Sequence, residues 1–178
     1  MWLKSVELFD MDALSEIVTG STVPSGRDGR PMNAIEVLSN RLVPGSDGSI
    51  EHVVIANDAV TIIRSTPNRG RPRVSRDNLI VGGVSCKLLV SGLDARVDTV
   101  RHLVGGEARV QGAVFIPKYK GTNLKAWGSN VAGSPSVVVQ HLIAKHCEAA
   151  RSASLIRLAK ELDGMFLPIE KLSAPKAA

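Results

Sequence analysis

The residues best suited to chemistry in this sequence are basic, and most of them fall in one short stretch between two apolar runs. Residues 64–77 hold five arginines against one acid. The five arginines are Arg64, Arg69, Arg71, Arg73 and Arg76. A guanidinium presents a planar fork of donors that fits phosphate, and Gly70 and Pro72 favour an extended backbone between the arginines. The stretch therefore predicts a flexible basic loop that contacts an anionic partner.

The centre of this loop, Arg69-Gly70-Arg71-Pro72, resembles the AT-hook. That element lays an extended Arg-Gly-Arg-Pro segment into the narrow minor groove of A·T-rich DNA, so the resemblance implies minor-groove binding. It occurs once in this chain and is flanked by β-like runs, whereas AT-hooks usually recur in disordered segments. A solvated surface loop without a ligand is the other interpretation of the same residues.

A second basic stretch, residues 118–127, interleaves three lysines with two aromatic residues. The lysines are Lys118, Lys120 and Lys125, and the aromatic residues are Tyr119 and Trp127. Charge combined with ring stacking can bind nucleic acid, and the same combination can hold a protein on an anionic membrane. In the alternative interpretation, the two rings cover the edge of the core while the lysines stay solvated.

No catalytic or metal-binding motif accompanies these basic residues. His141 and His146 are five residues apart, so a helix would place them on different faces, unlike a zinc pair. We expect them, with His52 and His102, to be ordinary surface or edge residues. The sequence also lacks the nucleophile-elbow, phosphate-loop, dinucleotide and zinc-protease motifs. We therefore expect no enzymatic activity, no cofactor and no metal. A small enzyme with an unrecognised site remains an alternative, with Asp94 and Glu107 as its candidate carboxylates.

The charge distribution is asymmetric along the chain. Residues 1–63 contain 4 basic and 9 acidic side chains, whereas residues 64–178 contain 18 basic and 8 acidic ones. Such asymmetry favours an anionic partner for the second part of the chain. It is equally compatible with contact between copies of the protein, acidic end against basic surface, or with a surface that is simply soluble.

Composition excludes several classes of protein. Six aromatic residues among 178 offer few stacking platforms, which argues against a single-strand binder that stacks bases on its sheet. Cys86 and Cys147 are too few for a disulfide framework, and we expect both thiols to be buried and reduced. No apolar run reaches the roughly 20 residues of a membrane span, and no secretory signal opens the sequence. We expect an intracellular location, in cytoplasm or nucleus, or a virus particle.

The periodicity predicts one α+β domain with a small mixed or antiparallel sheet, a long C-terminal amphipathic helix and short N-terminal helices. The expected parts are an acidic helical segment over 1–45, a basic body over 46–172 and a frayed tail over 173–178. Helices are expected over 6–18, over 33–42 and from Asp94 to Val104. Strands are expected over 50–56, 59–65, 79–90 and 107–116.

The C-terminal helix is expected to run over residues 135–163, with Ser134 as its N-cap and Pro135 at its first position. At 1.5 Å per residue it would span about 43 Å, more than a domain of this size needs to cover its core. One part is therefore expected to dock on another copy, around a middle of small residues. The candidate self-association residues are Val138, Leu142, Ala150, Ala153, Leu155 and Leu162. The alternative is that the helix lies across its own sheet.

Together these patterns predict a non-enzymatic structural or assembly protein that forms homo-oligomers. Its basic surface would contact nucleic acid or an anionic membrane, as small viral coat and matrix proteins do by analogy. The alternative is a cellular DNA- or RNA-binding regulator that uses the Arg-Gly-Arg-Pro loop.

Overall fold

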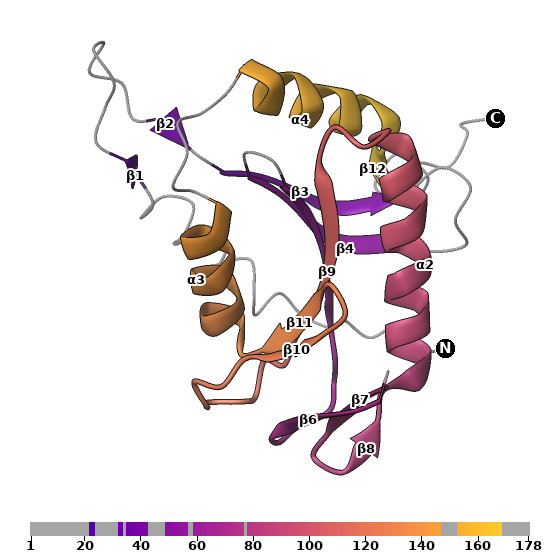
Figure 1. The fold of residues 1–178 in the computed structure, drawn as a ribbon, viewed down its shortest axis with the longest axis vertical. Helices are drawn as coiled ribbons and strands as arrows, with labels where there is room; N and C mark the ends of the chain where they lie inside the picture. Colours follow the sequence, from indigo (N-terminus) through magenta and orange to yellow (C-terminus); the bar gives the residue numbers. More distant parts are fainter. Residues whose placement is uncertain are drawn as a thin grey trace, which may run out of the picture.

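The computed structural model describes residues 22–23, 32–33, 35–42, 49–56, 59–76, 78–146 and 153–168. Within these ranges the chain forms a seven-stranded mixed sheet, a three-stranded sheet, a two-stranded pair and three helices (Figure 1). The large sheet has the strand order β10-β11-β9-β5-β4-β3-β12, in which β12 has only two residues.

The elements have the following bounds. The large sheet contains β3 (Ile35–Leu42), β4 (Ser49–Ala56), β5 (Ala59–Ser65), β9 (Arg109–Phe115), β10 (Lys125–Trp127), β11 (Asn130–Gly133) and β12 (Leu167–Pro168). The small sheet contains β6 (Pro72–Ser75), β7 (Asn78–Val81) and β8 (Val84–Ser85), and the isolated pair is β1 (Thr22–Val23) with β2 (Met32–Asn33). The helices are α2 (Lys87–Leu103), α3 (Pro135–His146) and α4 (Ala153–Met165).

The large sheet is parallel in its middle, where β5, β9 and β11 are neighbours, and antiparallel on either side, where β10 pairs with β11 and β3 with β4. Strands β3, β4 and β5 form an antiparallel meander, and β5 then pairs in parallel with β9, with Val60 opposite Val110. Two parallel strands in sequence need a crossover, and α2 provides it. The small sheet β6-β7-β8 is inserted into this crossover, between the end of β5 and the start of α2.

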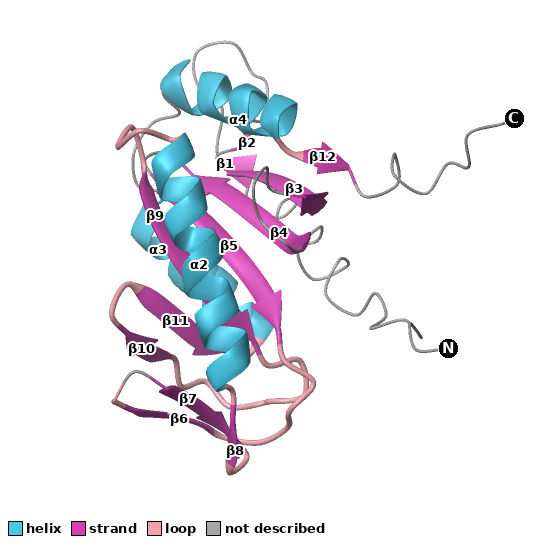
Figure 2. Cartoon of the chain, turned by 90° about the vertical axis from the view of Figure 1, so that its right-hand side faces the viewer, coloured by secondary structure: helices cyan, strands magenta, loops and turns pink. Residues whose placement is uncertain are grey.

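Helices cover both faces of the large sheet (Figure 2). Helices α2 and α4 pack on one face, where Leu93, Val97 and Leu162 join the larger apolar core. Helix α3 packs on the other face, where Val138 and Leu142 meet the strands. Because both faces are covered, residues 52–56 of β4 and 59–63 of β5 are buried without alternation, as is typical of strands covered on both faces.

The expected α+β fold with a small sheet is therefore wrong, and the chain has a mixed α/β architecture. Residues 33–42 were expected to be a helix because Ile35, Leu38 and Leu42 have helical spacing. They form β2 and β3 instead, and β3 pairs with β4 from Ile35 opposite Ala56 to Leu42 opposite Ser49. This long-range pairing overrides the local spacing. The helix expected over 6–18 lies outside the described residues.

The prediction of a single long C-terminal helix over residues 135–163 is also wrong, because α3 and α4 are separate helices on opposite faces of the sheet. The longest described helix is α2, with 17 residues. The prediction failed because an apolar stripe with helical spacing is compatible with one long helix and also with two consecutive helices. In either case the stripe covers the apolar surface of a sheet. Here each half of the stripe covers a different face.

The local prediction around α2 needs two corrections. Asp94 was expected to cap the helix, but α2 begins seven residues earlier, at Lys87, and Asp94 lies in its middle. The single strand expected over 79–90 is wrong: Gly82 and Gly83 adopt positive φ and make a tight turn between β7 and β8, and residues 87–90 belong to α2.

His52 was expected to be an ordinary surface or edge residue, and this expectation is wrong. It lies on β4 with 7 % of its surface exposed, and its Nδ1 shares a 3.1 Å hydrogen bond with Ser39 Oγ. Burial lowers the pKa of this imidazole, because the charged form loses its hydration.

This lowered pKa makes a prediction about acid stability. The unfolded chain binds a proton at His52 more readily than the folded chain, so the contribution of neutral His52 is complete above the unfolded pKa of about 6.5 and is lost as the pH falls below it. We expect the melting temperature of the His52→Asn variant to decrease less than that of the wild type between pH 7.5 and pH 5. The exposed His102→Asn control should keep the wild-type slope, and an unchanged slope in His52→Asn would contradict the prediction.

Candidate anionic-partner interface

One arginine of the predicted loop, Arg73, lies in a strand of the small sheet. Residues Pro72–Ser75 form β6, in which Arg73 is exposed while Pro72 is buried and Val74 is half-buried. Arg71 and Arg69 lie before the strand and are also exposed. The expectation of a flexible loop is therefore wrong over β6. The alternation of arginine with Pro72 and Val74 was the signal in the sequence that could have revealed it.

The AT-hook-like residues are packed against the turn between β7 and β8. Gly82 N donates a hydrogen bond to Arg71 O at 3.3 Å, and Gly70 has a φ of +109°. A Cβ atom on Gly82 would lie 1.9 Å from Arg69 O, so only glycine permits this approach of the two backbones. The segment thus differs from the free extended arm that the resemblance implies.

The second basic stretch lies beside the first. Its strand β10 packs next to β6, which belongs to the first stretch. Lys118 and Lys120 are exposed, and Lys125 is half-buried on β10. Trp127 is only 8 % exposed, and Tyr119 packs against the same core. The two rings therefore cover the edge of the core, as the alternative interpretation of this stretch held, and they do not form an exposed stacking platform.

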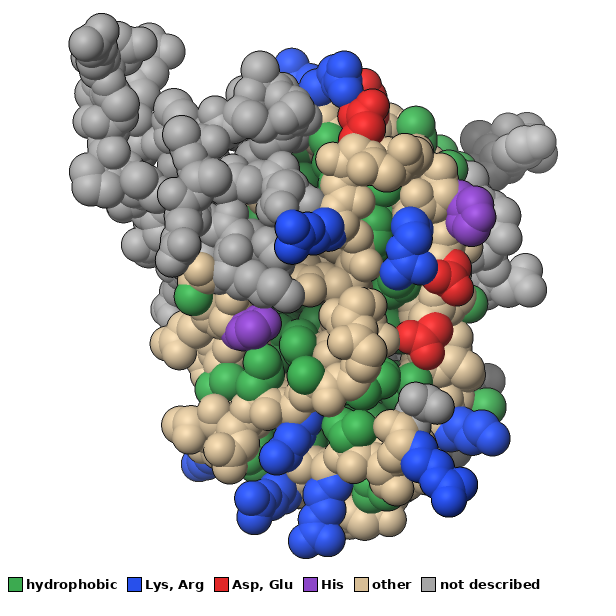
Figure 3. Space-filling view, viewed as in Figure 1, with side chains coloured by type: hydrophobic (Ala, Val, Ile, Leu, Met, Phe, Trp, Pro, Cys, Tyr) green, Lys and Arg blue, Asp and Glu red, His purple; other side chains and the backbone are tan. Residues whose placement is uncertain are grey.

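These two stretches make one end of the molecule strongly basic, as the blue side chains at the lower end of Figure 3 show. We call this surface the basic end. It consists of Arg69, Arg71, Arg73, Arg76, Lys87, Lys118, Lys120 and Lys125. Sequence reasoning missed Lys87, which lies at the first position of α2 rather than in the basic stretches.

Among the described residues, the charge of the basic end has no acidic counterpart. No described residue within 66–91 or 117–129 is acidic, and none of its eight cations forms an ion pair with another described residue. Several arginines elsewhere are paired: Arg41 with Asp163, Arg101 with Asp98, and Arg157 with Glu107 and Glu161. Guanidinium and ammonium groups without a described carboxylate partner are suited to bind an external anion.

Two large apolar side chains are exposed at the same end. Leu88 is 88 % exposed and Val84 is 53 % exposed, and both flank Lys87 at the junction of β8 and α2. Apolar groups beside a cation are typical of a surface that meets a partner with both apolar and anionic parts.

Arg64 stands apart from the basic end. It is half-buried at the end of β5, where its Nε lies 3.9 Å from Glu51 Oε1. It thus faces the α2 side of the large sheet, and the structure does not bring it together with the other arginines of its stretch.

The candidate self-association residues are divided among different surroundings. Val138, Leu142 and Leu162 are buried in the chain's own core, with at most 1 % exposed. Ala150 lies outside the described residues, and the side chains of Ala153 and Leu155 are likewise not described. Burial of the first three in the core fits the alternative in which the helical stripe covers its own sheet.

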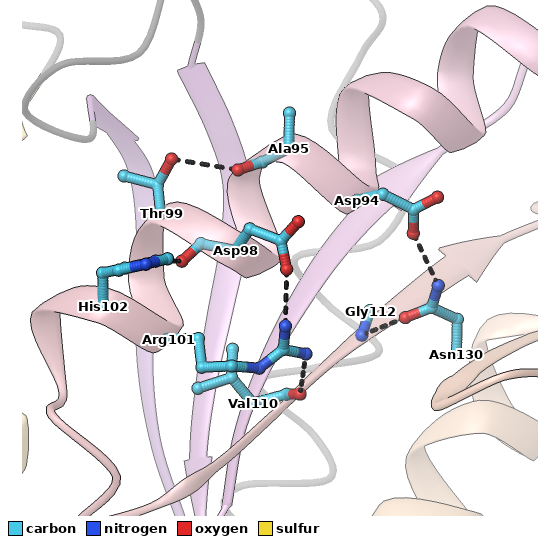
Figure 4. Close-up of polar contacts among 9 residues, drawn as sticks. All are labelled: Asp94, Ala95, Asp98, Thr99, Arg101, His102, Val110, Gly112 and Asn130. Atoms are coloured by element: carbon cyan, nitrogen blue, oxygen red, sulfur yellow. Dashed lines mark hydrogen bonds and ion pairs between the residues drawn. The ribbon is translucent and has the colours of Figure 1, made fainter.

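The candidate carboxylates have structural partners. Asp94 accepts a 2.8 Å hydrogen bond from Asn130 Nδ2, and Asn130 Oδ1 accepts one of 2.8 Å from Gly112 N (Figure 4). Glu107 pairs with Arg157 across 2.6 Å. The described residues contain no group of three His, Cys, Asp or Glu side chains that could hold a metal. Asn130 was not singled out from the sequence, because its contacts with α2 and β9 come from distant segments.

Cys86 is buried and unpaired at the position before α2, with Asn68 Nδ2 donating to its Sγ at 3.3 Å. It was expected within a strand and instead ends the turn that leads into the helix. Cys147 lies outside the described residues.

Comparison of the chain with protein-family models, curated proteins and solved structures gives no match. Among the described helices, none is long and apolar enough to cross a membrane.

The close approach at Gly82 leads to a testable prediction about how the basic end is held. Gly82→Ala combines the cost of a positive φ, about 1–2 kcal/mol, with a clash against Arg69 O. Gly83→Ala has the same φ problem but no atom within 4 Å of its Cβ, so it serves as the matched control. We expect urea denaturation to show a larger loss of stability for Gly82→Ala than for Gly83→Ala. Equal losses would mean that the backbone contact does not constrain the sheet.

Proposed function

We propose that this protein is a non-enzymatic structural protein that binds nucleic acid through phosphate contacts at the basic end. The observation that carries the proposal is the convergence of eight cations from three segments, none paired with a described carboxylate, on a rigid β-scaffold. Arginine and lysine side chains that contact phosphates bind without reading the base sequence.

The chemistry of the basic end supports phosphate contacts rather than base stacking. The two aromatic side chains of its second stretch face the core, so charge is the main attraction that it offers. If about four of the eight cations reach phosphates, the slope of log affinity against log salt is about −3 to −4. Binding of this kind weakens steeply as the salt concentration rises.

The first test removes two charges from the basic end. Arg71→Ala with Arg73→Ala should reduce the salt slope by about 0.7–0.9 for each lost phosphate contact, with little change in melting temperature because both side chains are exposed. Fluorescence anisotropy with a short duplex or single strand measures the slope. The matched control is Arg101→Ala with Arg157→Ala, which removes the same charge from exposed, ion-paired sites and should leave the slope unchanged.

An unchanged slope in the double variant, or an equal change in the control, would reject the basic end as the binding element. Competition between A·T-rich and G·C-rich duplexes separates the regulator alternative, because minor-groove binding by Arg69-Gly70-Arg71-Pro72 requires a preference for A·T pairs. Equal affinity for the two duplexes would support sequence-independent phosphate contact.

A second candidate function, attachment to an anionic membrane, is favoured by the exposure of Leu88 and Val84 beside Lys87. Insertion of two apolar side chains would add to the attraction between the lysines and arginines and the lipid headgroups. Leu88→Ser with Val84→Ser should then release the protein from phosphatidylserine vesicles in a flotation assay. The same variant should keep the wild-type salt slope with nucleic acid. Vesicle binding that does not depend on these two residues would remove the observation that favours a membrane.

A further inference from the structure

Two charged side chains end the apolar surface of β4 and β5 that faces α2. On β5, Val60 and Ile62 point into the core under α2, and Arg64 is the next residue on that face. On β4, Val53 and then Glu51 occupy the corresponding positions, since His52 pairs with Ile63 in the register. The apolar core therefore stops at a carboxylate and a guanidinium side by side.

A second arginine reaches the same place from α2. A Cβ atom on Gly92 would lie 3.2 Å from Arg96 Nη1 and 3.5 Å from Arg64 Nη1. Both guanidinium groups therefore lie over the same glycine, and the absence of a side chain there gives them room. Arg96 Nη1 also donates a 2.6 Å hydrogen bond to Gly92 O, which fixes its position on the helix.

The charges of this cluster do not balance. Glu51 is the one carboxylate within it among the described residues: its Oε1 lies 3.9 Å from Arg64 Nε, and its Oε2 accepts a 2.7 Å hydrogen bond from Ser65 N. Two guanidinium groups and one carboxylate leave one net positive charge in a half-buried place. The pKa of Arg96 is lowered, first by burial and then by the charge of Arg64, with Glu51 acting in the opposite direction.

Each of the two arginines also has a hydrogen-bond donor that lacks an acceptor among the described residues. The Nε atoms of Arg64 and Arg96 are shielded from solvent and have no hydrogen-bond partner among the described residues. A buried donor without an acceptor is costly, and two like charges close together add to that cost. A bound anion would relieve both, because its oxygens accept from the guanidinium donors and its charge neutralises the excess.

We propose that Arg64 and Arg96 form a binding site for a single phosphate-type oxyanion, with Glu51 holding Arg64 in place. The site is distinct from the basic end and does not use its residues. It lies at the end of β5, where the chain enters the segment that carries the basic end. Two sources of phosphate have the chemistry that this site would bind: free phosphate and the terminal phosphate of a nucleic-acid strand.

The test measures binding of inorganic phosphate to the full chain by isothermal titration calorimetry and by the rise in melting temperature, at constant ionic strength with chloride as the reference anion. We expect phosphate to raise the melting temperature of the wild type more than chloride does. Arg96→Gln and Arg64→Gln should each raise the Kd about 10- to 100-fold, since each removes charge-assisted hydrogen bonds. Arg101→Gln, an exposed arginine on the same helix, is the matched control and should bind phosphate as the wild type does.

The stability without phosphate distinguishes a ligand site from a merely structural pair. If two like charges are crowded, Arg96→Gln should unfold at a temperature equal to or above that of the wild type in chloride alone. If this variant fails to fold, Arg96→Lys keeps the charge but loses the planar fork, and should still weaken phosphate binding. A wild type that responds to phosphate and chloride alike, or an Arg96 variant that keeps full phosphate affinity, would overturn the proposal.

Two further arms identify the source of the anion and separate this proposal from the proposed function. If Arg96→Gln weakens binding of a 5′-phosphorylated oligonucleotide but not of its unphosphorylated counterpart, the site takes a strand terminus. If it affects inorganic phosphate alone, the ligand is free phosphate. Arg71→Ala with Arg73→Ala should retain phosphate binding while losing salt-dependent nucleic-acid binding, so either proposal can fail without the other.

Discussion

The packing of α2 on β9 is the contact on which the rest of the described structure depends. Leu93, which is fully buried, lies so close to Gly112 that a Cβ atom there would come within 2.8 Å of its side chain. Asn130 reinforces the contact, because its amide joins Asp94 on the helix to the backbone of β9. Since α2 follows the small sheet directly and also carries Arg96, this contact positions the basic end and the arginine cluster relative to the large sheet.

Several features could be predicted from sequence because they depend on local patterns. The strands over 49–56 and 59–65, the strand ending near Ile116 and the start of α3 at Pro135 agree with prediction to within one or two residues. The location of the positive charge also follows directly from composition along the chain. These are short-range signals: apolar runs, turn residues and a helix start fixed by proline.

Other features depend on contacts between distant segments, which local patterns do not encode. The spacing of Ile35, Leu38 and Leu42 fits a helix, and pairing with β4 makes it a strand. The convergence of the lysine stretch on β6, the divided stripe of α3 and α4, and the approach of Arg96 to Arg64 all follow from the topology of the sheet. The candidate site residues that the sequence indicated lie where charge is concentrated along the chain, and those that it missed are single residues that folding brings together.

The segregation of paired and unpaired arginines has a consequence for the approach of a partner, before any contact forms. Described carboxylates lie on β4, from Asp94 onward in α2, at Glu107 and on α4, whereas none of the described residues of the basic end is acidic, so the described part of the chain has a permanent dipole moment. In the field of a polyanion, such a dipole experiences a torque that turns the positive pole forward. Beyond a Debye length of about 8 Å this torque is screened at physiological salt, so the molecule is oriented only during the last stage of its diffusion. Charge placement would then govern the association rate, while the lifetime of the complex would depend on the close contacts made afterwards.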